Sequence, residues 1–264
     1  RVWKLLQDHA KTPGFVTTAL APRIDELVER LLTQVNVSFG ASLGNETRAA
    51  GESVKLSARA VSSEIRHRLC KYALNTIMEV FKLQELSMHV AKDTMRRLSV
   101  TLLGRLLDPR LRMQKEDDDV KGLVRGLNVL MLKVLENADF TTSFHTLLGL
   151  LTECCGQPEQ KVFMDLVVRC LIKLAKKLGD RLEGLDSAAL LRDVHNFLVQ
   201  HPPASFARAG AVPAPGQKAD DNPLKAVRTI VTELIKLSGE ELLPHMQGLP
   251  GDSRVVAWYH TISA

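Results

Sequence analysis

The sequence predicts an all-α protein built from stacked pairs of antiparallel helices. Apolar residues recur at spacings of three and four along most of the 264 residues, which is the pattern of amphipathic helices. Short polar or glycine-bearing segments separate these stretches, and none of them alternates as a β-strand would. Only 5% of the residues are aromatic, so Leu, Val, Ala and Ile supply the apolar surface, as helix-on-helix packing requires.

The N-terminal part predicts three helices. The first covers Val2–His9 and is broken by Lys11–Gly14. The second has one apolar stripe, formed by Ile24, Leu27, Val28, Leu31, Leu32 and Val35. A polar, glycine-bearing loop is expected at Gly40–Ser53. A long third helix follows, and its stripe ends in Leu69, Cys70, Ala73, Leu74, Ile77, Met78 and Phe81.

A turn near Lys82–Glu85 precedes the next helix. Its stripe comprises Val90, Met95, Leu98, Leu102, Leu103 and Leu106. Asp108-Pro109 ends this helix, because proline disfavours the helical conformation in the residue before it. The acidic run Glu116–Asp119 then suits a helix start, where carboxylates accept hydrogen bonds from unsatisfied N–H groups and favour the helix dipole. A metal site or a site for a basic partner is the less favoured interpretation of this run.

The stretch Gly126–Leu151 is the most informative part of the chain. It predicts two helices broken by one short polar turn, Asn137-Ala138-Asp139, with Asp139 as the N-cap of the second helix. The first helix carries an almost complete apolar face. A coiled coil is the competing interpretation, and it is disfavoured because no heptad register continues beyond this helix. The face consists of Val120, Leu123, Val124, Leu127, Leu130, Met131, Val134 and Leu135.

The next predicted helix starts near Pro158 and Glu159, residue types that suit a first helical turn. Its buried stripe is Val162, Phe163, Leu166, Val167, Cys170, Leu171, Leu174 and Leu178. Gly179–Leu185 forms a turn, and Asp186 or Ser187 caps a helix that buries Leu190, Leu191, Val194, Phe197 and Leu198.

Residues 202–221 are rich in Pro, Ala and Gly and lack an apolar period, so they are expected to form a flexible loop. Asn222-Pro223 starts another helix, and Gly239 fits its C-terminal end. The apolar stripe of this helix is Leu224, Val227, Ile230, Val231, Leu234 and Ile235. Asp252–Ser263 is expected to be one more capped helix.

The helix pairs repeat every 40–47 residues or so, which is the period of HEAT-type repeats. Each pair exposes an apolar flank unless a neighbour covers it. Stacking therefore predicts an α-solenoid with one continuous core and a ridge of turns along each edge.

Composition and motifs favour a binding role over catalysis. The sequence contains no P-loop, dinucleotide fingerprint, His-Glu-x-x-His motif or nucleophile elbow, so no catalytic residue, metal or cofactor is expected. The four cysteines indicate reduced thiols of a cytoplasmic protein. No apolar run reaches membrane-spanning length, so no membrane partner is expected. The net charge of +5 favours an acidic partner without choosing its class.

The turns between paired helices are the main binding candidates, because they face solvent and have no packing role. Trp3 is a candidate anchor at one end of this ridge, although a tryptophan at helical spacing is more often a core residue. A helix cap or a solubilising charge is the simpler interpretation of each turn residue. The candidates along the turns are Lys82, Gln84, Asn137, Asp139, Thr141, Lys177, Arg181, Lys236 and Ser238.

A second surface is the basic stripe of Arg169, Lys173, Lys176 and Lys177, which lies opposite the apolar face of its helix. It predicts an alternative function, a generic HEAT-like adaptor scaffold that binds a peptide or helix on its concave face. A solvated helix face is the simpler interpretation. No aromatic residues are interleaved with the stripe, so no nucleic-acid partner is expected.

Several blocks resemble the TOG-domain microtubule polymerase family, most closely its plant and green-algal branch. Together they cover nearly the whole chain in order and correspond to the C-terminal part of such proteins. The blocks are CKYALNTIMEVF (Cys70–Phe81), LNVLMLKVLENAD (Leu127–Asp139), DLVVRCLIKLAKKL (Asp165–Leu178), LLRDVHNFL (Leu190–Leu198) and PLKAVRTIVTELIKLSG (Pro223–Gly239).

The resemblance implies a single TOG-like HEAT-repeat domain over residues 1–264, and a non-catalytic role in microtubule plus-end growth and in spindle and microtubule organisation. It implies binding to tubulin, as the αβ dimer or a γ-tubulin complex, or to another microtubule-associated protein. It also implies location on cytoplasmic microtubules, the spindle and microtubule-organising centres.

In tubulin-binding TOG domains a tryptophan in the first turn and basic residues in later turns contact tubulin. Here the expected first turn, Lys11–Val16, contains no tryptophan, and the later turns contribute only Lys82, Arg181 and Lys236. The chain therefore resembles the divergent last TOG-like domain of the family, for which docking of an adaptor is the alternative expectation.

Overall fold

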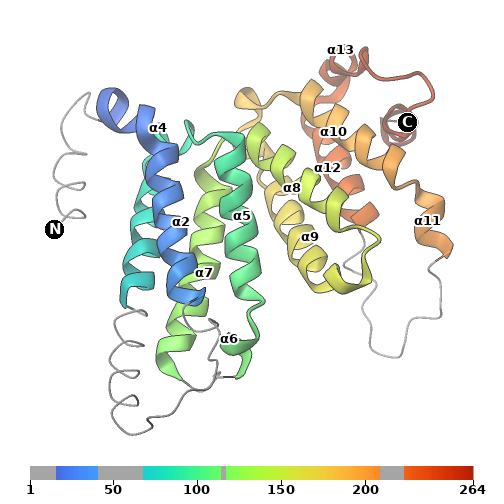
Figure 1. Ribbon diagram of the computed structural model, residues 1–264. Coiled ribbons are helices and arrows are strands. Elements are labelled where there is room, and N and C mark those ends of the chain that lie inside the picture. Colours follow the sequence, from blue (N-terminus) through green and yellow to red (C-terminus); the bar gives the residue numbers. More distant parts are fainter. Residues whose placement is uncertain (1–15, 41–67, 114–116, 209–222, 264) are drawn as a thin grey trace, which may run out of the picture. The chain divides into compact units, whose positions relative to one another are not determined.

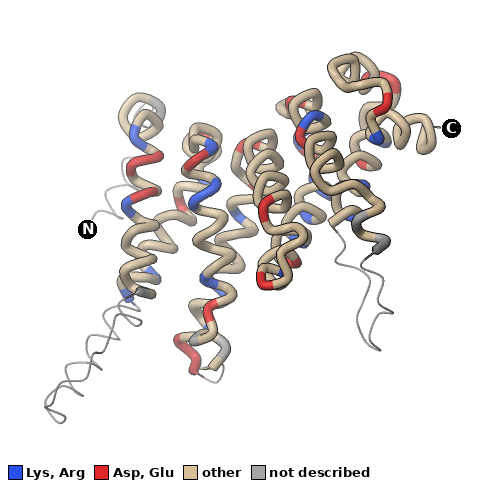
Figure 2. Tube along the Cα trace, turned by 45° about the vertical axis from the view of Figure 1, so that its right-hand side comes forward, with Lys and Arg blue, Asp and Glu red and all other residues tan. Residues whose placement is uncertain are grey.

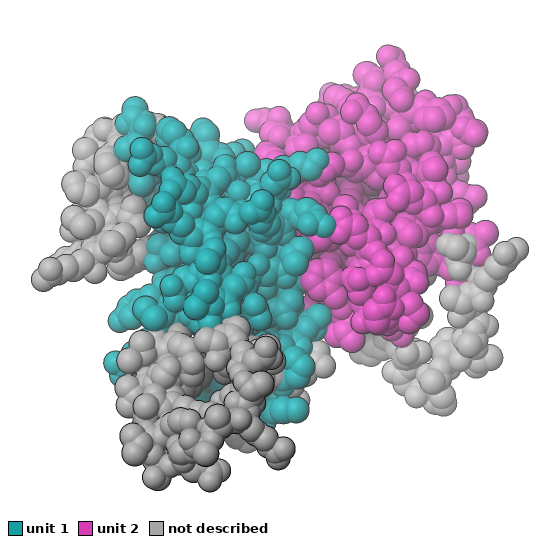
Figure 3. Space-filling model, in the orientation of Figure 1, with its two compact units in different colours: residues 1–138 teal, residues 139–264 magenta. Residues whose placement is uncertain are grey.

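A computed structural model describes residues 16–40, 68–113, 117–208 and 223–263. Every regular element within these ranges is helical, which confirms the predicted all-α fold class (Figure 1). The chain divides into two compact units, residues 1–138 and residues 139–264, coloured separately in Figure 3. The single domain expected over residues 1–264 remains a prediction.

The regular elements in the described part of unit 1 are all helical. It begins with η1 (Val16–Leu20) and η2 (Ala21–Arg23), which lead into α2 (Ile24–Gly40). A helix over residues 68–82 follows. The remaining elements are α4 (Gln84–Ser87), α5 (Lys92–Leu106), α6 (Pro109–Met113) and α7 (Asp118–Asn137).

Polar contacts fix the long helices of unit 1 side by side. Asp25 of α2 accepts a hydrogen bond from the backbone N–H of Ala91, at the start of α5, at 2.9 Å. Further along both helices, Arg97 pairs with Glu29 at 3.2 Å and Arg105 donates to Asn36 at 2.9 Å. These three contacts run in the same order along both helices, so α2 and α5 are parallel neighbours.

The acidic run before α7 is a helix start, as predicted. The Asp117 carboxylate accepts hydrogen bonds from the N–H groups of Asp119 and Val120, at 2.8 and 3.4 Å. The predicted apolar face of α7 is buried at seven of its eight positions, since Val124 alone stays partly exposed.

Unit 2 contains four long helices and several short elements. The long helices are α8 (Phe140–Cys154), α9 (Lys161–Ala175), α10 (Ser187–Gln200) and α12 (Pro223–Ser238). The short elements are η3 (Pro158–Gln160), η4 (Leu178–Asp180), η5 (Leu182–Gly184), α11 (Pro203–Arg208), η7 (Gly239–Leu242) and α13 (Leu243–Met246), and α14 (Arg254–Ser263) ends the described chain.

The long helices of unit 2 form two layers. α8 packs against α10 in one layer, α9 packs against α12 in the other, and the α8–α9 contact joins the layers. Gly156 reverses the chain between α8 and α9 with a φ of 83°, in the region that favours glycine. The buried stripes predicted from sequence line the space between the layers, where Leu171, Leu174 and Leu234 are fully buried.

The stretch Gly126–Leu151 contains the boundary between the two units. Its two helices are present, but the boundary between the units falls between Ala138 and Asp139, so they belong to different units. Within unit 2, α8 packs against α9 across the turn at Gly156. The pairing of the two helices inside this stretch as one hairpin remains a prediction.

Part of the expected flexible loop is helical. The loop was expected over residues 202–221, but α11 covers Pro203–Arg208, where Pro203 occupies the first helical position that proline tolerates. Residues 209–222 lie outside the described residues, as do the expected first helix and most of the Gly40–Ser53 loop. Among the described helices, none has the length and apolarity of a bilayer span.

Candidate partner-binding edge

Four helix ends meet at one edge of unit 2. α8 and α10 begin there and run parallel, because contacts of Thr141, His145 and Thr152 with α10 and its flanks follow the same order along both helices. α9 and α12 end there, where Gly179 lies against Leu237. We call residues 139–141, 176–186 and 236–243 the turn edge of unit 2. It contains five of the residues predicted from sequence to bind a partner, namely Asp139, Thr141, Lys177, Arg181 and Lys236.

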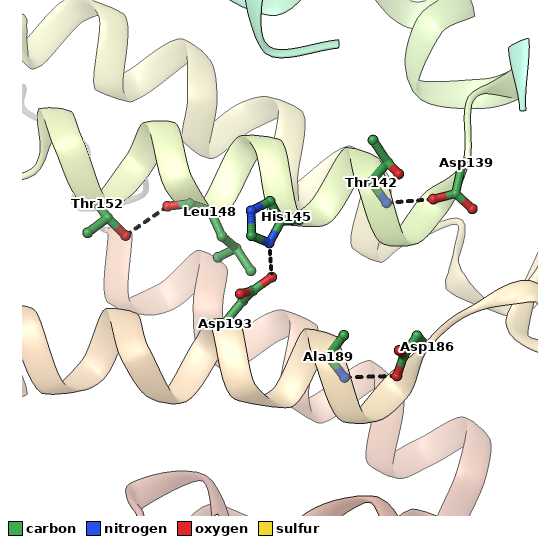
Figure 4. Close-up of polar contacts among 8 residues, drawn as sticks. All are labelled: Asp139, Thr142, His145, Leu148, Thr152, Asp186, Ala189 and Asp193. Atoms are coloured by element: carbon green, nitrogen blue, oxygen red, sulfur yellow. Dashed lines mark hydrogen bonds and ion pairs between the residues drawn. The ribbon is translucent and has the colours of Figure 1, made fainter. Parts of the chain in front are cut away.

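Two carboxylates cap the helices that start at this edge (Figure 4). Asp139 accepts a hydrogen bond from the N–H of Thr142 at 2.6 Å, and Asp186 accepts one from the N–H of Ala189 at 2.9 Å. Both carboxylates satisfy backbone donors that a helix start leaves unpaired. An N-cap of this type contributes about 0.5–2 kcal/mol. The predicted capping roles of Asp139 and Asp186 are confirmed.

Thr141 and Arg181 join the turn after α9 to the start of α8. The backbone N–H of Asp186 donates a hydrogen bond to Thr141 Oγ1 at 3.0 Å. The Arg181 guanidinium lies 5.5 Å from the centroid of the Phe140 ring, within range of a cation–π contact. The turn over residues 178–186 is therefore held at two points against one neighbouring helix end.

The end of α12 contributes the third side of the turn edge. A Cβ atom at Gly179 would lie 3.5 Å from Cδ2 of Leu237, so the turn after α9 contacts α12 closely. Gly239 ends α12 with a φ of 52°, as the predicted glycine end requires. Lys236 pairs with Glu233 of its own helix at 2.9 Å. Such exposed pairs are worth little, but they offset charge locally.

The exposed charge of this edge is predominantly acidic. Lys177 and Arg181 are only partly exposed, and Lys176 and Lys236 are exposed, but the turns expose five carboxylates. Of these carboxylates, the sequence predicts a role only for Asp186, as a helix cap, although Asp180 and Glu183 stand in the predicted turn Gly179–Leu185 and Glu240-Glu241 follow the predicted helix end at Gly239. The exposed carboxylates are Asp180, Glu183, Asp186, Glu240 and Glu241; Figure 2 marks acidic and basic positions along the trace.

Three other candidates lie in unit 1, around α4 and at the end of α7. Lys82 forms an ion pair with Glu79 one turn earlier, and Gln84 is exposed at the start of α4. Ser87 of α4 donates a hydrogen bond to the backbone oxygen of Asn137 at 2.7 Å, so α4 lies against the end of α7. Trp3 lies outside the described residues. The contact of any of these residues with a partner stays a prediction.

Titratable side chains do not gather into a reactive site in the described part of the chain, where no group of three potential metal ligands occurs. Burial raises the pKa of the Cys70, Cys154 and Cys170 thiols to about 11. Protonated buried thiols are poor nucleophiles and poor metal ligands at neutral pH. His145 contacts Asp193 at 2.7 Å and thereby joins α8 to α10 (Figure 4).

This all-α arrangement defines a helical-repeat protein whose described surfaces are helix faces and turn edges. The chain belongs to the TOG family of microtubule-associated proteins. It is 37% identical over 199 residues to Protein MOR1 of rice and 38% identical over 201 residues to Protein MOR1 of Arabidopsis thaliana. These matches cover 70% and 71% of this chain.

Protein mini spindles of Drosophila melanogaster is 27% identical over 158 residues, which is 60% of this chain. The aligned regions make up 9%, 10% and 7% of these three relatives, so the chain spans about a tenth of their length or less. No family model and no solved structure matches the chain.

Proposed function

We propose that this chain is a non-catalytic binding module of a microtubule polymerase or related microtubule-associated protein. It contacts tubulin, as the αβ dimer or a γ-tubulin complex, or another microtubule-associated protein through its turn edges. In this role it contributes to microtubule plus-end growth and to spindle and microtubule organisation, and it acts on the microtubule cytoskeleton. Family membership supports the microtubule context, and the turn edge of unit 2 supports the binding surface.

The observation that carries the choice of surface is the rigidity of the turn edge. The backbone of the edge is fixed by two N-caps, by the Thr141–Asp186 hydrogen bond and by the Arg181–Phe140 contact. A preorganised surface loses little conformational entropy when it binds. Its exposed carboxylates favour basic groups on the partner.

Co-migration of the full 264-residue chain in size-exclusion chromatography, with αβ-tubulin and separately with γ-tubulin complexes, tests the proposal. We expect co-migration with one of them. The triple variant Asp180→Lys, Glu183→Lys and Glu240→Lys should weaken that binding about tenfold, a loss of about 1.4 kcal/mol. These three side chains are exposed and neither cap a helix nor pair in the contacts described above.

The variant Asp118→Lys, Glu159→Lys and Asp252→Lys is the matched control, since it changes the net charge equally at exposed positions outside the turn edges. An equal loss in both variants would show a general charge effect and would overturn the choice of surface. Variants of Lys82, Arg181 and Lys236 to Glu test the basic candidates in the same way. Absence of co-migration with both tubulin forms would leave only an adaptor as the partner.

A further inference from the structure

A basic surface lies on the layer of unit 2 formed by α9 and α12. We define the outer basic face as the cationic side chains that these two helices direct away from the core. Arg169, Lys173 and Lys176 come from α9 and its last turn, and all three are exposed. The members from α12 are Lys225, Arg228 and Lys236, which are also exposed.

The layer arrangement brings the two rows together. Residues of α9 and α12 that face the α8–α10 layer are apolar and buried, including Leu171, Leu174 and Leu234. At 100° per residue, Lys173 and Lys236 fall on the opposite side of their helices. Because α9 and α12 pack side by side and end at the same edge, both rows face the same way in parallel.

Few carboxylates compensate this charge. Asp165 lies beside Arg169 on α9, and Glu233 pairs with Lys236 on α12. Six cations and two carboxylates leave this face with four excess positive charges. The formal net charge of the whole chain is +5. Lys173, Lys176 and Arg228 form no ion pair with any residue that the structure describes.

Helix stability does not account for all of these cations. Lys173, Lys176 and Lys236 lie near helix C-termini, where positive charge interacts favourably with the helix dipole. Lys225 lies in the first turn of α12, where a cation interacts unfavourably with the dipole. Arg228 lies in the second turn, where the dipole has little effect. The helix dipole therefore accounts for neither of these two cations.

We propose that the outer basic face binds an extended acidic segment of a polypeptide. Lys225 and Lys236 are eleven residues apart, so the row along α12 is about 16 Å long at 1.5 Å per residue. An extended chain rises about 3.3 Å per residue, so about five residues span the row. Alternate carboxylates on such a segment match cations on two parallel helices.

The chemistry of the face disfavours two other partners. The only aromatic residue of α9 and α12 is Phe163, which is partly buried at the start of α9, so the face offers little for base stacking of a nucleic acid. An amphipathic helix needs an apolar groove. The large apolar side chains that these helices expose most are Val162 and Leu237, at opposite ends of the face.

Fluorescence anisotropy with a labelled peptide of alternating Glu and Ser, about ten residues long, tests the proposal on the full chain. The variant Lys173→Glu, Lys176→Glu and Arg228→Glu should weaken binding at least about tenfold. Affinity for the wild-type chain should fall steeply with salt, since the contact is electrostatic. A peptide of Gly and Ser of the same length should not bind.

The control variant Lys92→Glu, Arg96→Glu and Arg192→Glu changes the net charge equally at exposed positions on other helices, and it should alter peptide affinity less than about twofold. Equal losses in both variants, or no binding of the acidic peptide, would overturn the proposal. The face would be assigned to nucleic acid instead if a single-stranded oligonucleotide bound more tightly than the acidic peptide and the Lys173→Glu, Lys176→Glu and Arg228→Glu variant abolished that binding.

This inference does not rest on the proposed tubulin contact. The edge variant Asp180→Lys, Glu183→Lys and Glu240→Lys should leave peptide binding intact, and loss of peptide binding should leave tubulin co-migration at the edge intact. Circular dichroism of each variant shows whether the helices remain folded, so a loss of binding is interpretable.

Discussion

The turn edge of unit 2 and its outer basic face are built from the same helices but differ in what their polar residues do. At the edge, Asp139, Asp186 and Thr141 accept backbone hydrogen bonds, and Arg181 lies on an aromatic ring. On the outer basic face, Lys173, Lys176 and Arg228 are exposed and have no such contacts with described residues. The net charge at the edge is negative and the net charge on the face is positive, although Lys176 and Lys236 belong to both regions.

This difference in contacts distinguishes polar residues that are needed for folding from polar residues that are available to bind a partner. A polar side chain that completes a helix end costs stability when it is removed, so its residue type is constrained by folding alone. A lysine on a solvated face is under no such constraint. Binding candidates at the turn edge must therefore be tested with exposed residues that cap nothing, whereas the outer basic face can be varied with little effect on folding.

Truncation of a side chain in the core that the two regions share should have the largest effect on stability. Leu174 of α9 is fully buried beneath the outer basic face, between the two layers. Leu174→Ala should lower the free energy of unfolding by about 2–5 kcal/mol, through lost apolar burial and a residual cavity. Chemical denaturation measures this. Val162→Ala, at a half-exposed position of the same helix, is the control and should have a much smaller effect.

Loss of the caps should have the next largest effect. Asp139→Ala and Asp186→Ala should each lower the unfolding free energy by about 0.5–2 kcal/mol, while Asn at either position should retain most of it. Lys173→Ala and Lys176→Ala should stay within about 0.5 kcal/mol of the parent protein. If all four alanine variants had equal unfolding midpoints in urea, the contrast between the two regions would fail.

A charge change at the start of α12 should separate stability from binding. Lys225→Glu replaces a cation in the first turn by a carboxylate, which should raise the unfolding free energy by about 0.3–1 kcal/mol through the helix dipole. The same variant should bind the acidic peptide more weakly. Thermal denaturation and anisotropy on one sample measure both quantities. A drop in stability would indicate that Lys225 has a structural role.

The smallest expected effect is a change in the reactivity of the Cys170 thiol, which lies beneath the outer basic face. Burial raises the pKa of Cys170 to about 11, and nearby Lys173 lowers it in part. Lys173→Glu should therefore raise that pKa further, reduce the thiolate fraction and slow alkylation on the order of twofold. Mass spectrometry follows the rate at Cys170, with Cys70 on unit 1 as an internal reference.

Burial of the Cys170 thiol also determines whether the stability of the protein rises or falls at high pH. Because the folded pKa of Cys170 exceeds the ordinary value of 9.0, its stabilising contribution is complete below about pH 9 and is lost as the pH rises through about 11. Cys170→Ala should flatten this part of the curve of stability against pH.

Local features of the fold could be predicted from the sequence. Apolar stripes located the long helices because burial follows the helical period. Asp139, Asp186 and Gly239 were identified as helix ends because each acts on its own backbone within a few residues. The start of α7 was predicted for the same reason. These signals need no knowledge of distant contacts.

Features that depend on packing could not be predicted. The boundary at Ala138 and the pairing of α8 with α9 depend on which helices share a core, and an apolar stripe does not name its partner. The basic stripe of α9 was visible, but its extension by Lys225 and Arg228 required the side-by-side packing of α12. The Arg181–Phe140 contact joins residues 41 positions apart, so it could not be predicted from local sequence, and the contact of Arg181 with a partner stays a prediction.

The opposite charges of the two regions also affect the kinetics of encounter. Unit 2 carries negative charge at one edge and positive charge on an adjoining face, so it has a permanent charge asymmetry. A strongly charged partner exerts a torque on such a body before contact, within a range of about 8 Å at physiological ionic strength. Unit 2 should therefore meet an acidic partner with α9 and α12 already turned toward it, which would raise the association rate in dilute buffer far more than at high salt.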